Sequence, residues 1–190
     1  SYPEQYLRYM GEVLTFDFGH SLKTKRPVSE MISEGVGKSV SLTLPALILT
    51  ALVSITFALF AAYFRGRGLD RGIMVLAVVG MSVSFLVYIV VLQYFLAFRF
   101  PIFQIHGYEP GFFERWQFLV LPIIIQVIVG MGYDTRFYRS VFVEEVARDH
   151  ITTAYAKGAS KQRVMFVHVL KNAMIPIITR VMISVPFLVT

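Results

Sequence analysis

Residues 39–64 read SVSLTLPALILTALVSITFALFAAYF and contain no charged side chain between Lys38 and Arg65. Crossing the hydrocarbon core of a bilayer takes roughly 20 mostly apolar residues. This run of 26 residues is therefore predicted to form a transmembrane helix. The alternative, a buried helix of a large soluble protein, is disfavoured because a second uncharged run of 27 residues follows between Arg71 and Arg99.

Two more apolar runs lie further along the chain, and charged residues make up only 16% of the whole, against about 25% in typical soluble domains. The sequence thus predicts an all-α, polytopic transmembrane helix bundle with three full spans and part of a fourth. The predicted spans are residues 39–64, 72–98, 118–139 and 172–190. Since the chain starts without Met and ends inside an apolar run, we expect it to be an internal fragment of a longer protein.

The basic residues are distributed unevenly between the segments that connect these runs. Segments 65–71 and 134–171 together hold ten of the 18 Lys and Arg residues. Basic residues accumulate in cytoplasmic loops of membrane proteins. We therefore predict a cytoplasmic turn at 65–71 and a cytoplasmic loop at 140–171, with an external segment at 1–38 and an external loop at 99–117. This distribution accounts for the net charge of +6 without a nucleic-acid partner.

The most informative stretch runs from Asp149 to Pro176 and reads DHITTAYAKGASKQRVMFVHVLKNAMIP. Good helix formers predict a short helix over residues 151–157. Gly158 suits the position after a helix end, where a left-handed backbone is needed, and Ser160 suits the N-cap of a second helix that runs from Lys161 toward Asn172. The small side chains around this turn would let another surface approach closely.

This stretch resembles the cytoplasmic EAA loop of ATP-binding-cassette importer permeases, in particular the dipeptide and oligopeptide permease group. The matching residues are Thr153, Ala154, Ala156, Lys157, Gly158, His168, Leu170, Asn172, Ala173 and Pro176. Residues 16–32 also resemble the group's external segment after its first span, and Leu121-Pro122 resembles the start of a later span. The sequence departs from the general Glu-Ala-Ala pattern at Thr152 and Thr153, and Leu170-Lys171 replaces the usual Leu-Pro.

The resemblance implies a type I importer permease of about six spans in a bacterial plasma (inner) membrane. It implies that the short helix docks on a separate ATPase and that di- or oligopeptides cross by alternating access. The coupling residues implied are Thr153, Ala154, Ala156, Lys157, Gly158, His168 and Asn172. The implied partners are a second homologous permease, two ATPase subunits that carry ATP and Mg, an external substrate-binding protein and membrane lipid.

Three polar side chains within the predicted spans are candidates for a substrate pathway: Gln93, Gln126 and Arg180. A charge inside a membrane is costly and usually faces a bundle interior or a water path. Arg180 could therefore line the pathway, pair with a structural partner, or extend its side chain to the membrane interface. These alternatives remain open at the level of sequence.

The sequence predicts that this chain is not an enzyme and binds no cofactor or metal itself. A phosphate-binding loop needs G-x-x-x-x-G-K-[ST], and although Gly37-Lys38-Ser39 ends like one, the required upstream glycine is Ile32. The chain has no cysteine, and its four histidines have no metal-ligand spacing. Two other functions remain: the same machinery with nickel or another small solute as cargo, and an ATP-independent secondary transporter or channel.

Overall fold

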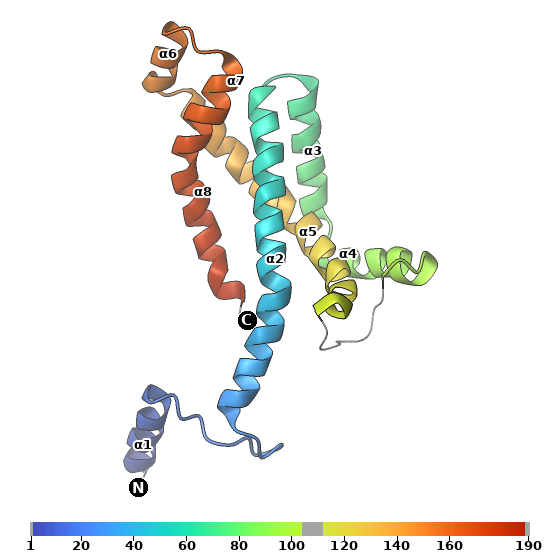
Figure 1. The fold of residues 1–190 in the computed structure, drawn as a ribbon, viewed down its shortest axis with the longest axis vertical. Coiled ribbons are helices and arrows are strands. Elements are labelled where there is room, and N and C mark those ends of the chain that lie inside the picture. Colours follow the sequence, from blue (N-terminus) through green and yellow to red (C-terminus); the bar gives the residue numbers. More distant parts are fainter. Residues whose placement is uncertain (1, 104–111, 189–190) are drawn as a thin grey trace.

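The computed structural model describes residues 2–103 and 112–188, and it consists of helices and the turns between them (Figure 1). Parts of three predicted segments lie outside the described residues: Ser1 of the external segment, 104–111 of the external loop and 189–190 of the last span. The long helices are α2 (Val28–Tyr63), α3 (Gly68–Ser82), α5 (Phe112–Val146) and α8 (Leu170–Ser184). The short elements are α1 (Tyr2–Leu14), α4 (Phe85–Gln93), α6 (Asp149–Ala156), α7 (Lys161–Arg163), the π-helices η1 (Tyr94–Arg99) and η2 (Val164–Val169), and the 3-10 helix η3 (Val185–Leu188).

The all-α, membrane-spanning fold class predicted from the sequence is confirmed. Three continuous helices of the described chain are long and apolar enough to cross a bilayer: Val28–Tyr63, Phe118–Val146 and Lys161–Ser184. The helices α7, η2 and α8 follow one another without a break and form the last of these. Helix α2 begins eleven residues before the apolar run that starts at Ser39, so helix bounds and apolar bounds differ.

The continuous helix expected over residues 72–98 is bent in the structure. Helix α3 ends at Ser82, α4 begins at Phe85, and their axes meet at 94°. Val83 (φ −88°, ψ 131°) and Ser84 (φ −61°, ψ 142°) have extended backbones, which ends the helical hydrogen-bond ladder. The Tyr88 hydroxyl donates to the Gly80 carbonyl at 2.9 Å, so one carbonyl near the end of α3 is satisfied by a side chain from beyond the bend.

Helix α2 packs along α5 through a stripe of small side chains. Buried small residues recur at every fourth position of α2: Ala46, Thr50, Ser54, Ala58 and Ala62. Residues four apart lie on one helix face, and small residues on that face let two membrane helices approach closely. The close approach extends to α3, because a Cβ atom added to Gly132 of α5 would lie 3.0 Å from the backbone oxygen of Ala77.

The main apolar core lies at the end of the molecule that carries α6 and the α2–α3 turn (Figure 1). Tyr138 and Phe142 of α5 are almost completely buried there, at 1% and 0% exposure. They join Ile151 of α6 and a group from the last long helix: Val164, Met165, Val169, Ala173 and Ile177. This cluster attaches the short helix α6 firmly to α5 and to the helix that follows.

Candidate functional site

The turn between α6 and α7 has the local structure that the sequence predicts. Gly158 has a φ of +82°, the left-handed conformation that favours glycine, and its N–H donates to the Tyr155 carbonyl at 2.9 Å. Ser160 caps the next helix, because its Oγ accepts a hydrogen bond from the Arg163 N–H at 3.4 Å. The helix, turn and second helix are thus confirmed, with α6 spanning Asp149–Ala156 and the next helix beginning at Lys161.

Most of the predicted coupling residues border one surface cavity of about 400 Å³. Five of the seven line it: Thr153, Ala154, Lys157, Gly158 and His168. Ala156 is exposed on α6 and does not line this cavity, and Asn172 lies on the neighbouring one. Five of the predicted coupling residues therefore lie together beside the short helix α6, and Asn172 lines the neighbouring cavity.

A polar network that sequence reasoning missed connects the two cavities. His150 lines both, and its Nε2 lies 2.9 Å from Asn172 Nδ2 and 3.1 Å from Glu145 Oε1. A neutral Nε2 can accept from the Asn172 amide, whereas a protonated one can donate to the Glu145 carboxylate. Arg148 Nε lies 3.1 Å from the second Glu145 oxygen. Only the Glu145–Arg148 spacing of three residues signals this network in the sequence, because His150 and Asn172 are 22 residues apart.

The three candidate pathway residues do not form one site. Arg180 has a structural partner, because its Nε lies 3.3 Å from Asp134 Oδ1, and its guanidinium lies 5.8 Å from the centre of the Phe137 ring. Gln126 is exposed on α5, two helical turns or about 12 Å from Asp134. Gln93 ends α4, beyond the 94° bend.

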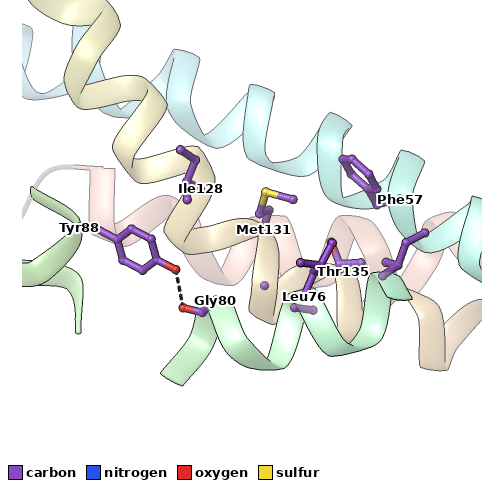
Figure 2. A pocket seen from close by; sticks show the side chains of 10 residues that line it. Phe57, Leu76, Gly80, Tyr88, Ile128, Met131 and Thr135 are labelled. Carbon is purple, nitrogen blue, oxygen red and sulfur yellow. Dashed lines mark hydrogen bonds between the residues drawn. The ribbon is translucent and has the colours of Figure 1, made fainter. Parts of the chain in front are cut away.

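A third cavity, apolar and of about 230 Å³, lies beside the α3–α4 bend (Figure 2). Its walls come from α2, α3, α4 and α5, and include Phe57, Leu76, Ile128 and Met131. The Tyr88–Gly80 hydrogen bond closes one side of it. Thr135 Oγ1 is buried at this cavity without a hydrogen-bond partner among the described residues. Walls of this kind provide no charged group for the termini of a peptide.

Residues that could hold a metal are not grouped anywhere in the described ranges 2–103 and 112–188. No cluster of three or more His, Cys, Asp or Glu side chains is found in them. A buried ion pair joins α3 to α5. Arg139 Nε and Nη2 donate to the two Asp70 oxygens at 2.6 and 2.7 Å, and the Gly66 N–H donates to Asp70 Oδ2 at 2.9 Å.

Comparison with known proteins agrees with this architecture. The chain is 30% identical to a probable peptide ABC transporter permease of Sinorhizobium fredii, over 98% of this chain and 61% of that protein. It is 35% identical to a glutathione transport system permease of Salmonella paratyphi A, over 97% and 58%. It is 31% identical to an oligopeptide transport system permease of Bacillus subtilis, over 96% and 60%. The chain thus spans about three fifths of the length of these curated relatives.

A family match covers the part of the chain that contains α3, α5, the α6 turn and the last long helix. Residues 54–190 match the family described as binding-protein-dependent transport system inner membrane component. This family supplies the membrane-embedded permeases of ABC transport systems, in agreement with the long apolar helices. The chain belongs to this family of inner-membrane components of binding-protein-dependent transport systems, and it is a multi-pass membrane protein.

Proposed function

We propose that this chain is part of the permease subunit of an ATP-driven importer that carries di- or oligopeptides by alternating access. One observation carries the proposal: five of the seven predicted coupling residues surround one cavity on a short exposed helix. That helix lies at the same end of the molecule as the basic turn 65–71 (Figure 1). The positive-inside rule favours the cytoplasm for this end, where an ATPase would dock.

The packing of α6 supports a role in transmitting force. Ile151 is 1% exposed and contacts the core formed by Val164, Met165 and Val169, which begin the helix that runs to Ser184. A displacement of α6 would therefore move this helix as well. For ATP to drive transport, each ATPase state must bind one arrangement of these helices better than the other.

The proposed assembly contains a second homologous permease, two ATPase subunits, an external substrate-binding protein and surrounding lipid. ATP and Mg would be bound by the ATPase subunits, and this chain would contribute no catalytic residue. The external segments 1–38 and 99–117 would face the substrate-binding protein. The relatives named as peptide and oligopeptide permeases support this assignment for a chain of the same family.

Short peptides are the proposed cargo because peptides appear in the names of two relatives and glutathione, a tripeptide, in that of a third. Nickel complexes or another small solute would use the same machinery, and uptake assays with labelled cargo separate these cases. An ATP-independent transporter or channel would carry cargo without any ATPase, and it would not account for the resemblance of the α6 turn to the EAA loop.

The decisive experiment changes the exposed face of α6 without straining its backbone. We expect Ala156→Trp, in the full-length permease and its partners, to weaken ATPase binding by at least about tenfold, equivalent to roughly 1.4 kcal/mol, and to reduce peptide uptake into proteoliposomes in proportion. Leu69→Trp is the matched control, because Leu69 is 47% exposed at the same end but belongs to α3 and not to α6. Normal ATPase binding by the Ala156 variant would contradict the proposal.

A further inference from the structure

A fourth cavity, of about 450 Å³, opens between the end of α2 and the start of the helix at Lys161. Its walls combine aromatic rings with two cationic side chains. The lining residues are Leu59, Phe60, Tyr63, Phe64, Arg67, Lys161, Gln162 and Phe166. Both helices leave the apolar part of the chain at this point, because Arg65 ends the first uncharged run and Lys161 begins the last candidate span.

The two cations are held by aromatic rings instead of carboxylates. Lys161 Nζ lies 4.6 Å from the centre of the Tyr63 ring, and the Arg67 guanidinium lies 5.9 Å from that of Phe64. Within residues 2–103 and 112–188, neither has a carboxylate oxygen within 4.0 Å. The acidic neighbour in the turn, Asp70, is already bound by Arg139. A cation–π contact orients a cation but leaves its charge uncompensated.

Other residues that line the cavity are apolar and belong to the membrane-spanning helices. Phe60 of α2 and Phe166 of η2 are 48% and 51% exposed, and both belong to candidate spans. The cavity therefore has positive charge where the spans end and aromatic surface where they enter the apolar region. A phospholipid with an anionic headgroup has the complementary arrangement, with its phosphate at the interface and its acyl chains beside the helices.

We propose that Arg67 and Lys161 bind the phosphate of an anionic phospholipid in this cavity, with its acyl chains against Phe60 and Phe166. The site would place a lipid in contact with both α2 and the helix that begins at Lys161, after the α6 turn. The inference depends on membrane insertion of the chain and not on its proposed transport function. A failure of the lipid test therefore leaves the proposed transport function standing, and a failure of the transport test leaves the lipid site standing.

The test measures lipid retained by the full-length permease complex in detergent, by native mass spectrometry after incubation with phosphatidylglycerol or with zwitterionic phosphatidylcholine. We expect selective retention of phosphatidylglycerol in the wild type. The double variant Arg67→Gln/Lys161→Gln should bind it about 30-fold more weakly, as expected for the loss of two basic side chains at a lipid surface. Arg67→Lys/Lys161→Arg should keep the selectivity, because both charges remain.

Arg71→Gln/Lys171→Gln is the matched control, since both residues are exposed, carry the same charge and lie outside the cavity. Unchanged retention in the Arg67/Lys161 double variant, or equal retention of both lipids by the wild type, would overturn the proposal. Millimolar inorganic phosphate should not displace the lipid; full displacement would show a site for free phosphate. Lipid that binds only after removal of the ATPase subunits would show that an acidic protein surface occupies the cavity, which would also overturn it.

Discussion

Two Asp–Arg pairs join the helices of this permease, and they differ in almost every physical respect. At the α2–α3 turn, Arg139 binds both oxygens of Asp70 at 2.6 and 2.7 Å, and the Asp70 side chain is only 5% exposed. Between α5 and α8, Arg180 reaches one oxygen of Asp134 at 3.3 Å, and its side chain is 40% exposed. The first pair has the fork geometry that makes Arg–carboxylate contacts strong, whereas the second does not.

The difference shows where a polar contact between helices is buried and double and where it is single and long, whereas apolar packing around Tyr138 and Phe142 joins α5 to the last helix as well. The Asp70–Arg139 pair, together with the Gly66 N–H, fixes the α2–α3 turn to α5. The Asp134–Arg180 pair joins α5 to α8 through one long contact that a small displacement would break. If the proposed alternating access is correct, we expect the Asp70–Arg139 pair to persist and the Asp134–Arg180 contact to be remade between states.

The largest expected effect comes from removing one member of the buried pair. Arg139→Met leaves the Asp70 carboxylate buried and unpaired, and it should lower the free energy of unfolding by about 3–5 kcal/mol. Thermal unfolding of the full-length protein in detergent measures the loss. Arg136→Met, an exposed arginine one turn earlier on α5, is the control and should change stability little. A small effect at Arg139 would remove the distinction between the two pairs.

An intermediate effect is expected where α3 and α5 approach most closely. A Cβ at Gly132 would lie 3.0 Å from the Ala77 carbonyl oxygen, which is backbone and cannot rotate away. Gly132→Leu should therefore separate α3 from α5 and cost about 1–3 kcal/mol. Gly72→Leu, at a position with no atom within 4 Å of the added Cβ, controls for the glycine-to-leucine change itself. Equal unfolding temperatures for both variants would show that α3 and α5 are not held as one unit.

The smallest loss of stability is expected at the exposed pair. Arg180→Gln should cost about 1 kcal/mol or less, because the contact is a single one at 3.3 Å and a glutamine amide can still donate to Asp134. In the same variant we expect peptide uptake into proteoliposomes to slow clearly while the unfolding temperature changes little. Arg180→Lys should keep most of the wild-type uptake rate. The comparison fails if Arg180→Gln lowers the unfolding temperature as much as Arg139→Met does.

The features that the sequence predicted correctly depend on local signals. Gly158 and Ser160 end one helix and begin the next for reasons contained within a few residues, and the long uncharged runs determine the membrane-spanning class. The bend between α3 and α4 has no such signal, because Val83 and Ser84 are neither Pro nor Gly. It is stabilised by Tyr88 across the break, a contact that exists only once both helices are folded.

The proposed coupling residues lie close together mainly for a local reason as well. Residues of α6 and its turn come together because they are near neighbours in the chain. His150 was not predicted, because its partners Glu145 and Asn172 are brought to it by packing of α5 and α8. Arg180 was recognised as unusual, but its pairing with Asp134, 46 residues away, required the structure.

The length of α2 determines how far the protein rises above the lipid. At 1.5 Å per residue its 36 residues measure about 54 Å, against about 30 Å of hydrocarbon. Its first three turns carry Glu30, Glu34 and Lys38, and Arg26 just before the helix bridges both glutamates at 3.4 and 2.7 Å. These charged turns need water, so we expect the first three turns of α2, about 16 Å in length, to extend beyond the acyl chains into the interface.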